Sequence, residues 1–71
     1  MTGMRYAIVI EHAGRNYSAY SPDVPGVIGV GDTPEECRDD MRDGIAALLG
    51  ELAKEGKPAP EPRTIVEHVD V

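Results

Sequence analysis

Residues 17–36 read YSAYSPDVPGVIGVGDTPEE, and two predicted strands and the beginning of a predicted helix meet in them. Residues 17–20 are short and rich in strand-forming side chains. Two prolines then bracket Asp23 and Val24, and Gly26 follows, which predicts a chain reversal over residues 22–26. The apolar run at 27–31 predicts the next strand. Gly29 weakens that strand unless another backbone, a bulky side chain or a partner comes close there.

The helix that follows has the clearest local signal. Thr33 is a favourable N-cap, Pro34 suits the first helical position, and Glu36 stands where a capping box needs it. Lys54 and Gly56 predict the end of the helix. Gly44 beside the apolar stripe permits close packing. Apolar side chains recur at helical spacing, at Cys37, Met41, Ile45, Leu48, Leu49 and Leu52.

The flanking segments complete the pattern. Residues 5–11 alternate as a strand, with Tyr6, Ile8 and Ile10 on one face, and residues 12–16 predict a hairpin loop in which Gly14 or Asn16 takes a positive φ. Residues 58–62 are a proline-rich extended linker. Residues 63–71 alternate again and predict a fourth strand, paired within the monomer or across a dimer.

The predicted order is β-β-β-α-β, an α+β fold of one antiparallel sheet on one long amphipathic helix, and residues 1–71 form a single domain. One helix covers one face of a sheet. The other face, which includes Val9, must be tolerated, polar or used for binding.

The length and composition of the chain limit its possible partners and location. A chain of 71 residues buries little surface, and its single cysteine forms no internal disulfide, so we expect a dimer or larger homo-oligomer. A net charge of −6 argues against direct nucleic-acid binding. It fits plain solubility, the favoured reading, or a basic partner. No signal peptide or membrane-spanning run is recognisable, which places the chain in the cytoplasm.

A search for catalytic chemistry finds no strong motif. The Gly26-x-x-Gly29-x-Gly31 spacing lacks the lysine of a phosphate loop, and Cys37 lies on the apolar stripe, where core packing is favoured over reactivity. His12 and His68 make a weak metal case. We therefore expect no enzyme activity, no metal and no cofactor. A solvated helix face accounts best for Glu35, Glu36, Asp39, Asp40 and Asp43, although a basic partner could also contact them.

Three segments together resemble the HicB antitoxins: RYAIVIE at 5–11, YSAYSPDVPGV at 17–27 and GDTPEE at 31–36. The likeness continues through the helix into residues 56–62. It implies a partial ribonuclease-H-like domain that binds and blocks HicA, a small basic ribonuclease toxin with a catalytic histidine. Many members carry a C-terminal DNA-binding segment. This chain stops after the fourth predicted strand, so we expect it not to bind an operator alone.

The resemblance makes an antitoxin that masks the active site of a HicA-like toxin the leading hypothesis. Tyrosines are favoured at interfaces, so the predicted contacts lie in the 17–26 segment. The alternatives are a small-ligand sensor or structural oligomer, and a weak metal-dependent nuclease using carboxylates such as Asp23 and Asp32. The predicted partner-binding residues are Tyr17, Tyr20, Pro22, Asp23 and Pro25.

Overall fold

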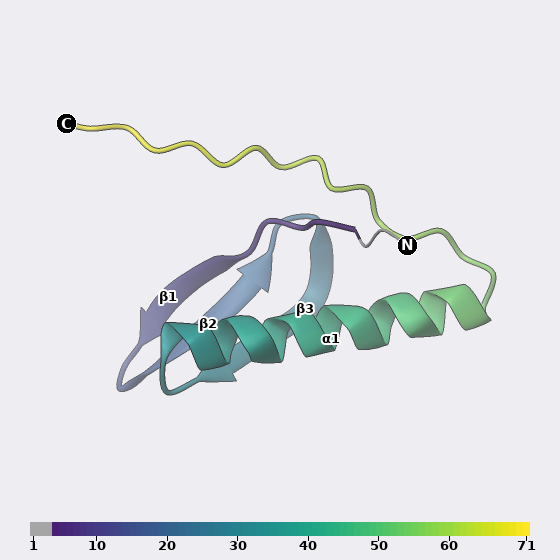
Figure 1. The fold of residues 1–71 in the computed structure, drawn as a ribbon, viewed down its shortest axis with the longest axis horizontal. Coiled ribbons are helices and arrows are strands. Elements are labelled where there is room, and N and C mark those ends of the chain that lie inside the picture. Colours follow the sequence, from purple (N-terminus) through teal and green to yellow (C-terminus); the bar gives the residue numbers. More distant parts are fainter. Residues whose placement is uncertain (1–3) are drawn as a thin grey trace.

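The computed structural model describes residues 4–71, and in it three strands precede one long helix (Figure 1). The strands are β1 (Val9–Ala13), β2 (Asn16–Ser21) and β3 (Val24–Gly31), and the helix is α1 (Pro34–Lys54). They form an antiparallel sheet of order β1-β2-β3. The predicted α+β fold, with one sheet packed on one helix, is confirmed.

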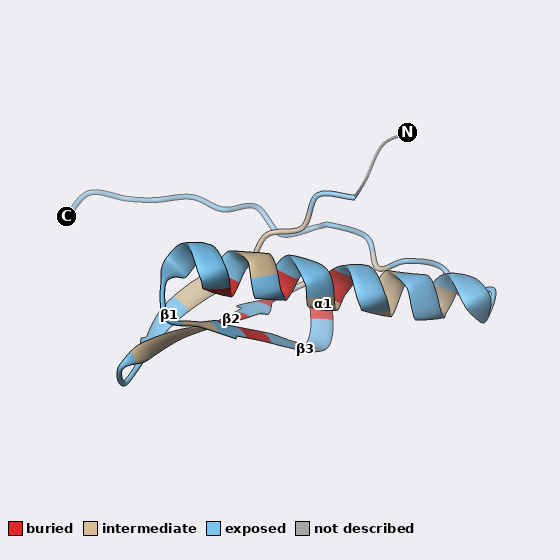
Figure 2. Cartoon of the chain, turned by 60° about the horizontal axis from the view of Figure 1, so that its bottom comes forward, coloured by how far each residue is buried: buried red, intermediate tan, exposed pale blue. Residues whose placement is uncertain are grey.

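Helix α1 lies across one face of the sheet and buries the first half of its apolar stripe. Its buried residues are Cys37, Met41 and Ile45, and they pack with Ala19 and Val24 of the sheet. Leu48, Leu49 and Leu52 are only half-buried. Figure 2 shows the reason: the buried bands of α1 face the sheet, and the C-terminal half of the helix extends past the strands. A helix of 21 residues is about 30 Å long, which exceeds the length of strands that have five to eight residues.

The N-terminus of α1 is capped as predicted, with one difference. The Thr33 hydroxyl accepts a hydrogen bond from the Glu36 N–H at 3.1 Å, and Pro34 is the first helical residue. The Glu36 carboxylate, however, accepts the N–H of Asp32 at 3.0 Å rather than that of the cap residue. The cap therefore extends back over the end of β3 and fixes the strand-to-helix connection.

Two glycines of β3 let the helix backbone approach the sheet. A Cβ atom at Gly29 would lie 2.9 Å from both the Cβ and the backbone nitrogen of Met41, and one at Gly31 would collide with the backbone nitrogen of Cys37. Gly44 plays the same role on the helix, because a Cβ there would lie 2.9 Å from Val27. Of the alternatives left open at Gly29, the close approach of another backbone is the one observed, and the expectation that Gly44 permits close packing is confirmed.

The strand boundaries differ from the predicted ones for local reasons. Only Gly14 and Arg15 connect β1 to β2, with Gly14 at φ +74°, so both strands are longer at this end than predicted. At the other end Pro22 offers no N–H, and the carbonyl of Ala7 accepts the Ser21 hydroxyl instead at 2.7 Å. The β1 ladder therefore begins at Val9.

Strand β3 begins earlier than predicted. Val24 already pairs with Ser21, whereas the next pair is Tyr20 with Ile28. The intervening residues bulge, and Gly26 at φ +90° supplies the left-handed conformation that the bulge needs.

The predicted fourth strand, residues 63–71, is corrected: this segment is extended but pairs with no strand of the described chain. The Asp23 carboxylate accepts the N–H groups of Arg63 and Thr64, which are thereby taken from any ladder. Beyond this point the segment runs clear of β1 in both views (Figures 1 and 2). We call residues 63–71 the C-terminal arm.

The close approach at Gly29 predicts a stability difference between two glycine substitutions. Gly29→Ala should lower the free energy of unfolding by about 1–3 kcal/mol, because the new methyl group meets the backbone of α1. Gly50→Ala is the control. A Cβ at this exposed helical position meets nothing within 4 Å, and alanine should raise stability by up to about 1 kcal/mol. Urea unfolding measures both, and an unchanged midpoint for Gly29→Ala would contradict the packing described.

Candidate partner-binding surface

The sheet face opposite α1 is uncovered and largely apolar. Directly paired residues of antiparallel strands share a face, so the register places Val9, Tyr20 and Ile28 in one row and Glu11, Ser18 and Val30 in the next. Tyr20 is 46% exposed, Ile28 72% and Val30 55%. We call these six residues the open face. Figure 2 shows the sheet under the helix with its lower face uncovered.

The glycines of β3 determine which apolar side chains reach this face. Side chains alternate along a strand, so Gly29 and Gly31, which the helix backbone requires, force Ile28 and Val30 to the opposite side. The small Ala19 pairs with Gly29 in the same layer and is buried. At this point the helix packs against the smallest residues of the sheet, and the larger side chains of Ile28 and Val30 remain exposed to solvent.

The outer edge of β3 is partly closed by the helix. The Val30 N–H donates to the Asp40 carboxylate of α1 at 2.9 Å. This N–H would otherwise be available to a strand that added to the β3 edge. A partner is therefore expected to meet the face of the sheet rather than this edge.

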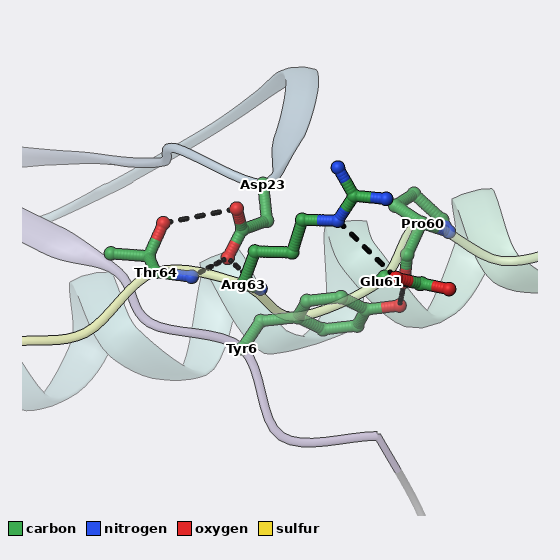
Figure 3. A network of polar contacts seen from close by, with 6 residues as sticks. All are labelled: Tyr6, Asp23, Pro60, Glu61, Arg63 and Thr64. Carbon is green, nitrogen blue, oxygen red and sulfur yellow. Dashed lines mark hydrogen bonds and ion pairs between the residues drawn. The ribbon is translucent and has the colours of Figure 1, made fainter.

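The β2–β3 turn holds the base of the C-terminal arm (Figure 3). One Asp23 carboxylate oxygen accepts the backbone N–H groups of Arg63 and Thr64 at 3.1 and 2.9 Å, and the other accepts the Thr64 hydroxyl at 2.9 Å. Close by, the Tyr6 hydroxyl donates to the Pro60 carbonyl at 2.7 Å. These contacts fix where the arm leaves the domain.

The five residues predicted to bind a partner do not form one surface. Tyr20 lies on the open face, and Pro22 and Pro25 are exposed at the turn end of the sheet. Asp23 is half-buried and engaged with the arm. Tyr17 packs against the core on the helix side, with its ring 4.4 Å from that of His12. Their role in partner binding stays a prediction.

The sequence reasoning missed Ile28 and Val30. The apolar strand pattern alone does not separate the two faces of β3, and the exposure of both residues follows from the glycines beside them. The sequence does contain a signal for this. In the run VIGVG at 27–31, Ile28 and Val30 alternate with Gly29 and Gly31, so the glycines and these two side chains must lie on opposite faces of the strand.

The remaining chemistry of the described residues is limited. Cys37 is fully buried, its thiol donates to the Gly29 carbonyl at 3.6 Å, and burial together with the Asp40 carboxylate raises the pKa of the thiol. The expectation that Cys37 packs in the core is confirmed. Within residues 4–71, no three His, Cys, Asp or Glu side chains are grouped as metal ligands. In the same range, no helix has both the length and the apolar character needed to cross a membrane.

Comparison with protein families identifies the family to which the chain belongs. Residues 6–71 match the sequence model described as a HicB-like antitoxin of a bacterial toxin–antitoxin system. The chain belongs to the HicB-like antitoxin family. Searches of curated proteins and of solved structures found no match. The matched range covers the sheet, the helix and the arm, so the open face of this HicB-like antitoxin lies entirely within the family domain.

The arm tether of this HicB-like antitoxin should depend on pH. Hydrogen bonds, first that from the Thr64 N–H, hold the pKa of the Asp23 carboxyl below its ordinary value. A carboxyl whose pKa is lowered in the folded state stabilises the contact fully at pH values above its unfolded-state pKa of about 3.9. This stabilisation is lost as the pH falls through the lowered, folded-state pKa. The Thr64 amide resonance, followed by NMR, should therefore shift in a step below pH ~3.9.

Asp23→Asn is the control, because the titrating group is removed and the step should disappear. A step at about pH 3.9, the value of an unperturbed aspartate, would contradict the tether.

Proposed function

We propose that this chain neutralises a small, basic, HicA-like ribonuclease toxin by binding over its active site. The observation that carries the proposal is the open face, where Tyr20, Ile28 and Val30 are exposed side by side on a chain of antitoxin kinship. Apolar and aromatic side chains of this kind form the centres of protein interfaces.

The chemistry of the open face fits a basic protein surface. Tyr20 lies in its middle strand, between Val9 and Ile28, and offers an aromatic ring and a hydroxyl. Glu11 adds an exposed carboxylate in the neighbouring row. A partner with apolar side chains surrounded by lysine or arginine would bury its apolar side chains against the open face and pair a cation with the Glu11 carboxylate.

The charge of the chain supports the same partner class. The net charge is −6, and the first turns of α1 carry five acidic residues, of which Asp40 also closes the β3 edge. Opposite charge accelerates encounter with a cationic partner and contributes less to final affinity. The acidic residues of α1 therefore attract the basic partner during encounter, and the open face makes the contacts that hold it.

The remaining parts of the proposal concern assembly and place of action. The chain acts in the cytoplasm as a homo-oligomer, without catalysis of its own and without direct contact to nucleic acid. The β-β-β-α order corresponds to the first four elements of the β-β-β-α-β order expected of a partial ribonuclease-H-like domain.

Substitutions on the open face test the proposal. Tyr20→Ala and Ile28→Asp should each weaken binding to the small basic ribonuclease encoded beside this gene by at least about 30-fold, as expected at an interface centre. The loss of RNase inhibition should follow the loss of binding. Calorimetry measures the affinity, and cleavage of labelled RNA measures inhibition.

Ala47→Asp is the matched control, because it introduces the same charge at an exposed position of α1 away from the open face. It should bind like the original chain. Unchanged affinity in both open-face variants would contradict the surface assignment, and failure of the original chain to bind the neighbouring ribonuclease would contradict the toxin assignment.

A further inference from the structure

The C-terminal arm exposes apolar side chains that a folded chain normally covers. Ile65 is 81% exposed and Val69 82%, and Val66 and Val71 are exposed as well. The arm alternates, with Ile65, Glu67, Val69 and Val71 on one side and Thr64, Val66, His68 and Asp70 on the other. This is the pattern of a strand that belongs in a sheet, yet no strand lies beside it in the described chain.

The arm is held only at its base. Asp23 binds the backbone of Arg63 and Thr64, and Tyr6 binds that of Pro60. In the described chain, no backbone hydrogen bond connects residues 65–71 to another segment. Figures 1 and 2 both show the arm leaving the domain and ending away from the strands. Thr64 and Val66 still line a shallow hollow with Arg5, Tyr6 and Ala7 of the same chain. Beyond them the arm makes no backbone hydrogen bond in the described chain, which leaves it available to another molecule.

The same chain also presents an unfilled place for a strand. Strand β1 is an edge strand, paired only with β2 in the described sheet. Between the segment leading into β1 and helix α1 lies an open groove of about 450 Å³. Its floor is apolar and includes Ile8, Ile45 and Leu49. Side chains alternate between the two faces of a strand. If a strand were added at the outer edge of β1, every second side chain of it would therefore lie over this groove.

Charge and pattern match the arm to this groove. Arg5, Arg38 and Arg42 line the groove together with its apolar floor. On one side of the arm, Glu67 stands between Ile65 and Val69, so a carboxylate is flanked by two apolar side chains. The apolar pair suits the floor, and the carboxylate suits the arginines. The arm, residues 63–71, is also as long as residues 5–13, the segment that contains β1.

We propose that two copies of this chain exchange their C-terminal arms, each arm adding as a strand to the outer edge of β1 in the other copy. Ile65 and Val69 then cover the groove, and Glu67 faces its arginines. Because every copy carries both the arm and its receptor, one two-fold axis satisfies both exchanges and the assembly closes as a dimer. The exchange buries the exposed apolar side chains of the arm and pairs the free edge of β1.

The inference rests on the homo-oligomer part of the proposed function and not on the toxin, so the full-length chain alone tests it. Light scattering after size-exclusion chromatography should give a dimer. The double variant Ile65→Asp, Val69→Asp should raise the dimer dissociation constant at least about 100-fold, as expected when two buried contacts are lost. Since both residues lie outside the core, the helical signal of α1 in the circular dichroism of the variant should stay unchanged.

His68→Asp is the matched control, because it places an aspartate on the other side of the arm and should leave the dimer intact. Mixing two isotopically labelled populations then identifies the chain to which each arm belongs. Isotope-filtered NMR should show contacts between Ile65 or Val69 of one copy and Ile45 or Leu49 of the other.

Each contrary result has a distinct meaning. A monomer, or arm contacts confined to one chain, would overturn both the exchange and the homo-oligomer. A dimer that survives the double substitution would overturn the exchange alone. None of these results depends on whether the chain binds a ribonuclease.

Discussion

The contact between the backbone of α1 and the glycines of β3 is the constraint on which the rest of the structure depends. At Gly29 and Gly31 no side chain fits between strand and helix. Cys37 and Met41 of the helix lie directly against these glycines and are the most deeply buried residues of the helix. The other core side chains, such as Val24 and Ile45, pack around this close approach, which sets the distance between the helix and β3.

This constraint also assigns the two faces of the sheet. Because the glycines face the helix, Ile28 and Val30 must face solvent, and Tyr20 joins them from β2. An exposed apolar face is costly for a chain that acts alone, and it suits a chain that works by binding another protein. The packing that holds the fold together therefore also exposes the surface proposed to bind the toxin.

Local signals in the sequence predicted much of the fold. The Thr33–Glu36 cap, the apolar helical stripe and Gly14 in the hairpin turn each depend on neighbouring residues, so they could be read directly. The orientation of β3 and the fate of residues 63–71 depend on tertiary contacts. A strand pattern reports that a segment can pair, whereas the Asp23 tether, invisible in sequence, decides where the arm leaves. Tyr17 and Tyr20 were both predicted to bind the partner because tyrosines are favoured at interfaces. The register of the strand that they share places them on opposite faces of the sheet.

The central claim is that the face opposite the helix binds the toxin, and an NMR footprint tests it most directly. Amide and methyl resonances of this chain are recorded while an unlabelled HicA-like ribonuclease is added. The account predicts that the largest shifts and line broadening fall on Val9, Tyr20, Ile28 and Val30, with little change at Ala47 on the outer side of α1. A footprint centred on α1, with the open face unchanged, would contradict it.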